Sequence, residues 1–270
     1  MTENCTLILS GEISNTTLDL IKEALNEKDL LIELDLSRTT GLTEITEDQF
    51  NSFRKLSKIV LPDTLKTISA HAFRNCDGLT SLTLPDSVTT IKDDAFGYSE
   101  NLRTITISKN TNSIGIGVFR GCDSLTSIEV SPGNTKFKSI DGVLYSYDET
   151  AIYCYPKGKS GNSYSIKSSV TCIKNYAFFA CNDLTNIYIP FTVTTIEKNA
   201  FSYCTNLTAI TLPSTVKSIN ARVFENCTSL NSIYFNGSVF VWKDVSKGSD
   251  WVKNVPAKNV QCTDMIWTIN

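Results

Sequence analysis

The chain has 270 residues, 41% of them hydrophobic and 20% charged, which excludes a disordered or collagen-like protein and fits one large domain or two small ones. Its 25 Lys and Arg residues against 28 Asp and Glu residues give a net charge of −3, so we expect no general attraction to nucleic acid or anionic membranes. The apolar stretches, such as Leu7–Leu9, fall far short of the roughly 20 residues that cross a bilayer. We therefore expect no transmembrane segment.

The first residues, Met1–Glu12, lack the basic start and the apolar core of about 7–15 residues that a secretory signal needs. The sequence thus predicts either a cytoplasmic protein or one whose leader is missing. Nine cysteines would suit a disulfide framework, but the number is odd and a chain of this length does not need covalent crosslinks. The spacing of the cysteines supplies a better explanation.

An Ala-Phe or Val-Phe pair recurs in steps of 23 residues, interrupted by a single step of 59. The pairs are Ala72-Phe73, Ala95-Phe96, Val118-Phe119, Ala177-Phe178, Ala200-Phe201 and Val223-Phe224. Three residues after each Phe comes a small residue: Cys76, Ser99, Cys122, Cys181, Cys204 or Cys227. Five of the nine cysteines therefore occupy one repeated position, and we expect them to be reduced, buried thiols rather than disulfides or metal ligands.

A strand motif also repeats. Leu79–Pro85 has the pattern L-x-x-L-x-L-P, and closely similar segments stand at Leu184–Pro190 and Leu207–Pro213. The alternation at its end predicts a short strand with one buried side, and the Pro turns the chain out of the strand. Since a unit of 23 residues cannot bury an apolar face alone, the units must stack into a solenoid with parallel strands about 4.8 Å apart and the Phe side chains in a central row.

The segment Leu79–Leu102, LTSLTLPDSVTTIKDDAFGYSENL, resembles the BspA-type leucine-rich repeat, a 23-residue class of bacterial and protist surface proteins. The resemblance covers about residues 31–235. It implies a right-handed, predominantly β leucine-rich-repeat solenoid, export from the cell, and binding to host or matrix proteins without enzymatic activity. The family offers no binding residues that carry over by position.

Residues 1–30 are predicted to form an N-terminal cap, and residues 31–235 the solenoid. The cap contains an amphipathic helix over Ser14–Lys28, with Ser14 or Asn15 as its N-cap and Leu18 on its apolar face. Leu31, Leu34 and Leu36 then begin a degenerate first repeat whose open edge the helix closes.

The 59-residue step holds an inserted hairpin segment at about 131–163. Its Asp141-Gly142 pair is typical of a tight hairpin turn, and Ala151–Tyr155 is predicted as a further short strand. The family commonly carries such a hairpin. It is interpreted either as a tolerated insertion or as a binding surface.

Residues 236–270 are predicted to form an aromatic C-terminal cap. Four large aromatic residues lie there after the repeat pattern stops: Phe240, Trp242, Trp251 and Trp267. We expect them to cover the last repeat, with a ligand-stacking site as the alternative.

The sequence lacks a convergent catalytic set. His71 is the only histidine, and other repeats place Asp94, Gly117, Tyr176 or Asn199 at the same position, so we expect it to be solvent exposed and not catalytic. No C-x-x-C motif is present, and Gly115 and Gly117 do not begin a phosphate loop. We predict no enzyme, no cofactor and no metal.

Surface positions on the strands are the remaining candidates for function. The two positions that flank the middle residue of each repeat strand project outward, and half of them hold Ser or Thr. We predict binding through this concave face, with Tyr188 and Tyr234 as anchors and Asn186, Thr211 and Glu129 as further contacts. An ordinary strand surface is the alternative, because Thr favours strands.

The sequence therefore predicts a non-enzymatic, monomeric adhesion module that binds a protein or a glycan at a cell surface or after secretion. One alternative is an intracellular, cytoplasmic protein-interaction scaffold. A second is a catalytic or regulatory domain built around the hairpin, with aromatic residues such as Tyr145 and Tyr155.

Overall fold

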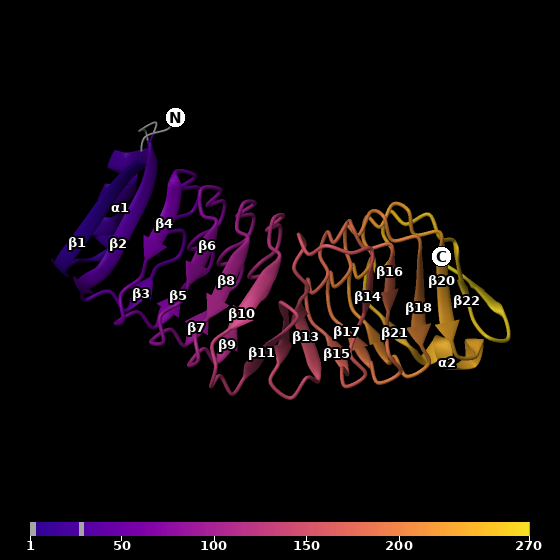
Figure 1. Ribbon diagram of the computed structural model, residues 1–270. Helices are drawn as coiled ribbons and strands as arrows, with labels where there is room; N and C mark the ends of the chain where they lie inside the picture. Colours follow the sequence, from indigo (N-terminus) through magenta and orange to yellow (C-terminus); the bar gives the residue numbers. More distant parts are fainter. Residues whose placement is uncertain (1–3, 27–29, 270) are drawn as a thin grey trace. The chain divides into compact units, whose positions relative to one another are not determined.

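The computed structural model describes residues 4–26 and 30–269. The chain divides into two compact units, Met1–Val143 and Leu144–Asn270. In each unit, strands of successive turns pair in parallel and build several sheets, and Figure 1 shows these strands repeating along the chain. The predicted β solenoid is confirmed.

The first unit contains two series of strands. The longer strands are β1 (Asn4–Glu12), β2 (Leu31–Thr40), β4 (Leu56–Val60), β6 (Ser81–Thr83), β8 (Thr104–Ile107) and β10 (Ser127–Val130). The shorter ones are β3 (Glu44–Ile45), β5 (Thr67–Ile68), β7 (Thr90–Ile91) and β9 (Ser113–Ile114), and β11 (Phe137–Ile140) follows them. Within β6, β8 and β10, Ile105 pairs with Leu82 on one side and Ile128 on the other, which are the positions one 23-residue repeat away.

The second unit repeats this arrangement. Its longer strands are β14 (Ser163–Ser165), β16 (Asn186–Tyr188), β18 (Ala209–Pro213), β20 (Ser232–Asn236) and β22 (Asn259–Gln261), with β23 (Ile266–Thr268) antiparallel to β22. The second series begins with β13 (Ala151–Cys154) and continues with the two-residue strands β15 (Cys172–Ile173), β17 (Thr195–Ile196), β19 (Ser218–Ile219) and β21 (Ser246–Lys247). β12 (Val143–Ser146) pairs antiparallel with β13, and α2 (Val239–Asp244) follows β20.

A row of stacked aromatic rings runs through the core of each unit. Ring centroids are 5.2, 5.5 and 5.9 Å apart along Phe50, Phe73, Phe96 and Phe119. They are 5.4, 5.1 and 5.5 Å apart along Tyr155, Phe178, Phe201 and Phe224. The predicted Phe row is therefore present, and each ring fills the interior against the ring of the next repeat.

The turns that carry these rings are joined by backbone hydrogen bonds. The N–H of Phe73 donates to the carbonyl of Ala95 at 2.7 Å, and the N–H of Phe201 donates to Val223 at 3.0 Å. Two residues of each turn adopt positive φ to make these bonds possible, as at Asp94 (φ 50°) and Tyr98 (φ 59°). A left-handed residue other than Gly costs about 1–2 kcal/mol, which the inter-repeat contacts must offset.

The repeated Cys position supplies a hydrogen-bond donor to the preceding repeat. Cys204 Sγ lies 3.0 Å from the carbonyl oxygen of Phe178, and Cys227 Sγ lies 3.1 Å from that of Phe201. At the one repeat with serine, Ser99 Oγ donates to Phe73 at 2.7 Å. Both Cys and Ser fit this position because each side chain is small and carries a hydrogen-bond donor.

None of the nine cysteines, all of which lie in the described residues, forms a disulfide. Burial raises the pKa of the Cys76 thiol from 9.0 to about 12. The Cys76 thiol of the unfolded chain ionises at a lower pH than the buried thiol of the folded protein. The stability that this pKa shift contributes is therefore present below pH 9.0 and is lost as the pH rises toward 12. At neutral pH the buried Cys76 thiol is protonated and shielded, which makes it a poor nucleophile.

The N-terminal helix α1 (Asn15–Asn26) starts at the predicted cap, where the Thr17 N–H donates to Ser14 Oγ at 3.2 Å. Leu18 is its fully buried residue, and Gln49 of the first turn donates to the Asn15 carbonyl at 3.2 Å. The rest of the predicted helix, residues 27–28, lies outside the described residues. β1 was not predicted; it pairs in parallel with β2 and so covers the edge of β2 that the helix was expected to close.

Two further aromatic residues extend the row of rings in the second unit, one at each end. Tyr155, 23 residues before Phe178, begins the aromatic row, and Trp251 ends it with its ring 6.3 Å from Phe224. Trp242 is fully buried and packs against Trp251 at 5.7 Å. Phe240, expected to cover the last repeat as well, is instead 75% exposed, because α2 turns this side chain outward while it buries Trp242.

Replacing Phe201 by Ala should lower the free energy of unfolding by about 3–5 kcal/mol, because the change opens a cavity in the middle of the aromatic row. Phe191→Ala is the matched control, since Phe191 is 75% exposed. Its effect should stay within about 0.5 kcal/mol. Chemical denaturation measures both values, and similar effects for the two variants would show that the row does not carry stability.

Cys204→Ser should be less destabilising than Cys204→Ala by about 1 kcal/mol, because Ser retains a donor for the Phe178 carbonyl and Ala does not. Ser99 shows that a hydroxyl fits the equivalent place. The free energy of unfolding of the two variants, measured under reducing conditions, gives the comparison. An Ala variant as stable as the Ser variant would mean that the thiol acts only as a space filler.

Candidate functional site

The outward face of the longer strands in the second unit carries no charged side chain along its repeated positions. These positions are Ser163, Ser165, Asn186, Tyr188, Ala209, Thr211, Ser232, Tyr234, Asn259 and Gln261. The corresponding face of the first unit holds Glu33, Asp35, Lys58 and Glu129. A neutral face with tyrosine is typical of the centre of a protein interface, where charged residues are depleted.

Tyr188 and Tyr234 are the large side chains of this face. Tyr188 is 63% exposed and Tyr234 is 38% exposed. Strand register pairs Tyr234 with Thr211, and Thr211 stands one repeat after Tyr188. The two tyrosines are therefore two repeats apart, roughly 10 Å at about 4.8 Å per strand.

Phe191 adds a third exposed aromatic residue that the sequence analysis missed. It follows Pro190 in the turn after β16, where other repeats carry Asp63, Asp86 and Ser214. The turn is well fixed, because the Val193 N–H donates to the Pro190 carbonyl at 3.1 Å and the Thr192 hydroxyl donates to Val170 at 2.7 Å. An apolar residue at a position that is otherwise polar could have been found by aligning the repeats with one another.

The other predicted contacts differ in their surroundings. Asn186 is exposed, and its amide donates to the Thr185 hydroxyl at 3.1 Å. Thr211 is exposed between the tyrosine positions. Glu129 belongs to the first unit, where it accepts a hydrogen bond from Ser127, so it is not part of the second unit's face.

The hairpin tyrosines do not form an open catalytic cluster. Tyr145 is fully buried, and its hydroxyl lies 2.6 Å from that of Tyr164. Burial, with the Tyr164 hydrogen bond, raises the Tyr145 pKa, so this hydroxyl stays protonated. Asp141 (φ 51°) and Gly142 (φ 78°) are the two left-handed residues of a type I′ turn at the tip of the hairpin. A larger residue would not fit at position 142, because its Cβ would lie 2.6 Å from Ser127 Oγ.

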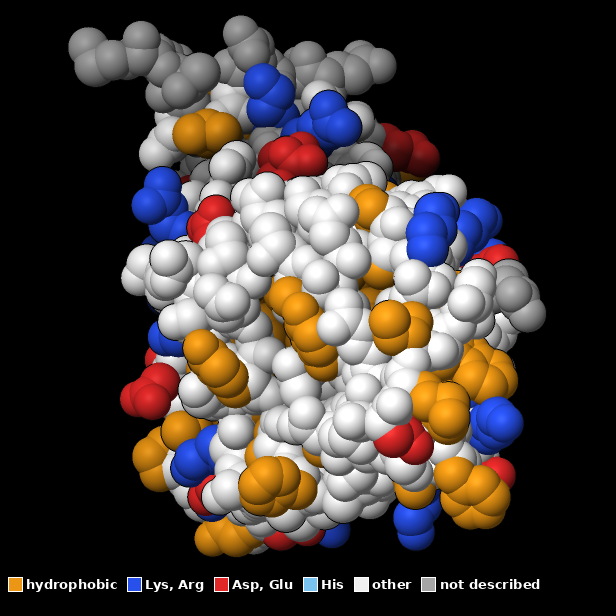
Figure 2. All heavy atoms as spheres, turned by 90° about the vertical axis from the view of Figure 1, so that its right-hand side faces the viewer, with side chains coloured by type: hydrophobic (Ala, Val, Ile, Leu, Met, Phe, Trp, Pro, Cys, Tyr) orange, Lys and Arg blue, Asp and Glu red, His pale blue; other side chains and the backbone are white. Residues whose placement is uncertain are grey.

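Exposed apolar side chains also occur in the C-terminal segment, at Phe240, Met265 and Ile266. Figure 2 shows hydrophobic side chains at separate places on the face that it presents, with charged groups near its margins. This scattered pattern contrasts with the ordered spacing of Tyr188 and Tyr234. Neither helix of the described chain is long and apolar enough to cross a bilayer.

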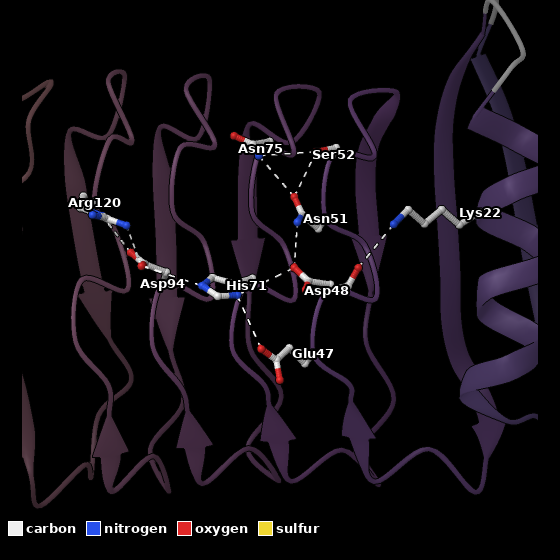
Figure 3. Close-up of polar contacts among 9 residues, drawn as sticks. All are labelled: Lys22, Glu47, Asp48, Asn51, Ser52, His71, Asn75, Asp94 and Arg120. Atoms are coloured by element: carbon white, nitrogen blue, oxygen red, sulfur yellow. Dashed lines mark hydrogen bonds and ion pairs between the residues drawn. The ribbon is translucent and has the colours of Figure 1, made fainter.

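His71 is half-buried rather than fully exposed, with 30% of its side chain accessible. Its ring lies among the carboxylates of Glu47, Asp48 and Asp94, as Figure 3 shows. These residues come from three successive turns of the first unit.

The family model for the BspA type leucine rich repeat region matches residues 4–142 and 149–246, in 6 copies. The pneumococcal vaccine antigen PcpA has 23% identity and a TM-score of 0.68, over 86% of this chain and 61% of its own. A leucine-rich repeat protein from Eubacterium ventriosum has 25% identity and a TM-score of 0.68, over 86% of this chain and 68% of its own.

No curated protein matches the chain in sequence. The chain spans 61% of the length of the PcpA structure, and that likeness shows the fold. Repeats of this kind are protein-interaction modules, and the family match covers most of the chain. The chain belongs to the BspA-type leucine-rich repeat family.

Proposed function

We propose that the chain is a non-enzymatic module that binds a protein partner through the outward sheet face of the second unit. Tyr188, Phe191 and Tyr234 are the anchors of this face, and Asn186 and Thr211 supply polar contacts around them. The observation that carries the proposal is the 63% exposure of Tyr188 on a face whose repeated positions are uncharged, with Phe191 75% exposed in the turn that follows the same strand.

The rigid backbone favours binding. β18 and β20 pair continuously from Ala209–Ser232 to Pro213–Asn236, so Tyr234 stands on a fixed strand. Tyrosine offers a large contact area with few rotatable bonds, and little conformational entropy is lost when a partner covers it. A partner of ordinary size could cover both tyrosines at once, because roughly 10 Å separates their strands at about 4.8 Å per strand.

We further propose that the module acts at the cell surface or after secretion, and its membership of the family supports this location. Glycan binding and an intracellular scaffold role are the competing functions. A glycan site would also use tyrosine and amide groups, so the identity of the bound molecule must decide between protein binding and glycan binding. The hairpin is a weaker candidate surface, because its Tyr145 is buried.

The binding face is tested with a photo-crosslinking amino acid at position 188. Crosslinking in the presence of intact source cells or their secreted fraction should attach one protein partner, identified by mass spectrometry. The same group at position 147, which is 53% exposed in the hairpin, is the control and should give no such product. A glycan adduct at position 188 would favour the glycan function instead.

For the partner so identified, Tyr188→Ser with Tyr234→Ser should raise the Kd at least 30-fold, because an interface anchor typically contributes about 2 kcal/mol or more. Stability should change by no more than about 0.5 kcal/mol for each exposed substitution. Tyr147→Ser is the matched control and should leave the Kd unchanged. Calorimetry gives the affinities. An unchanged affinity in the double variant would exclude this face.

The cellular location of the protein is tested separately, by protease accessibility. Protease treatment of intact cells that express the natural gene should remove the protein if it is displayed at the surface. Protection until the cells are lysed would instead support the intracellular scaffold.

A further inference from the structure

Three potential metal ligands meet on the turns of the first unit (Figure 3). His71 Nδ1 lies 3.8 Å from Glu47 Oε1 and 3.8 Å from Asp48 Oδ1. One ligand atom from each of the three residues falls within 4.8 Å of the others. Ligand atoms about 2.1 Å from a shared metal are roughly 3–3.5 Å apart, so small side-chain movements would close the group around an ion.

The repeat fixes the backbone beneath this group. Asp48 and His71 hold the same position in consecutive turns, with φ of 58° and 57°. The Asp48 N–H donates to the Ala70 carbonyl at 3.2 Å, and the His71 N–H donates to Asp93 at 3.2 Å. His71 follows Asp48 by 23 residues and Glu47 by 24, which is why short ligand-spacing motifs gave no sign of the group.

Neighbouring side chains orient two of the three ligands. Asn51 Nδ2 donates to Asp48 Oδ1 at 2.7 Å, which holds that carboxylate beside the imidazole. On the other side of the ring, His71 Nε2 faces Asp94 Oδ2 at 4.0 Å. A carboxylate facing the second nitrogen is the usual companion of a metal-bound histidine, because it favours the tautomer that leaves the ligating nitrogen free.

Arg120 pairs with the carboxylate of Asp94 and so removes it from the set of potential metal ligands. It donates to both oxygens of Asp94, at 3.0 and 2.7 Å. This pairing makes Asp94 a positioning residue rather than a fourth ligand. Glu47 and Asp48 have side chains that are 68% and 54% exposed, so water has access to the remaining coordination positions.

We propose that Glu47, Asp48 and His71 bind one divalent metal ion of the borderline class, such as Zn²⁺, through His71 Nδ1 and an oxygen of each carboxylate. One imidazole and two carboxylates suit such an ion, and the two negative charges balance its charge. Lys22 Nζ, 3.4 Å from the Asp48 carbonyl oxygen, is a nearby positive charge that opposes binding. The site is independent of the binding face of the second unit.

His71 is the only histidine, so ¹⁵N-labelled histidine in the full chain without a polyhistidine tag gives signals from a single imidazole. Titration with Zn²⁺ should shift Nδ1 saturably at one equivalent, with a much smaller change at Nε2. Zinc taken up by cysteine thiols would not produce this pattern. No Nδ1 response up to millimolar Zn²⁺, or a response at Nε2 alone, would overturn the proposal.

Variants provide the second part of the test. Glu47→Gln with Asp48→Asn should raise the Kd for Zn²⁺ at least tenfold, and Asn tolerates the left-handed backbone at position 48. Lys22→Gln should lower the Kd, because it removes the opposing charge. Asp63→Asn, an exposed carboxylate change elsewhere in the same unit, is the matched control and should leave the Kd unchanged. A double variant that binds Zn²⁺ as tightly as the parent chain would also overturn the proposal.

Discussion

The fold depends on how each turn is held to the next one. A Phe or Tyr ring stacks on its neighbour at 5.1–5.9 Å, and the N–H of the same residue bonds to the following turn. These contacts stabilise left-handed residues that would otherwise be strained, including Tyr98 and Arg222. A single repeat would have neither the stacking nor the inter-turn bonds, so the repeats are stable only as a stack.

This dependence explains what the sequence predicted and what it missed. Phe spacing and the L-x-x-L-x-L pattern predicted the strands, the aromatic row and the buried Cys position, because packing imposes them on every repeat. β1 was missed because its partners in β2 follow at a spacing of 27 residues, as in Asn4 with Leu31, and not 23. Trp251 was expected in the cap over the last repeat, but it follows Phe224 by 27 residues, so the 23-residue spacing did not place its ring in the aromatic row. The variable position of His71 suggested a free surface, but its left-handed φ shows that the backbone restricts it to residues without β-branching.

The candidate sites were predictable to different degrees. Tyr188 and Tyr234 could be found from sequence, because strand alternation determines which side chains face outward. Phe191 required a comparison of turns, and the group of Glu47, Asp48 and His71 required the stacking of one turn on the next. Both proposed sites depend on stacking, which places side chains from separate repeats at fixed separations on the uncharged face of the second unit and on the charged turns of the first.

Amide hydrogen exchange on the native protein tests the central claim, that the bonds between turns are as essential to each unit as its strands. The N–H groups of Phe73 and Phe96 in the first unit, and of Phe178 and Phe201 in the second, should be protected as strongly as that of Ile105 in β8 or Ile233 in β20. Protection near the level of the global free energy of unfolding is the predicted result. Fast exchange of the Phe amides, with the strand amides still protected, would contradict the account.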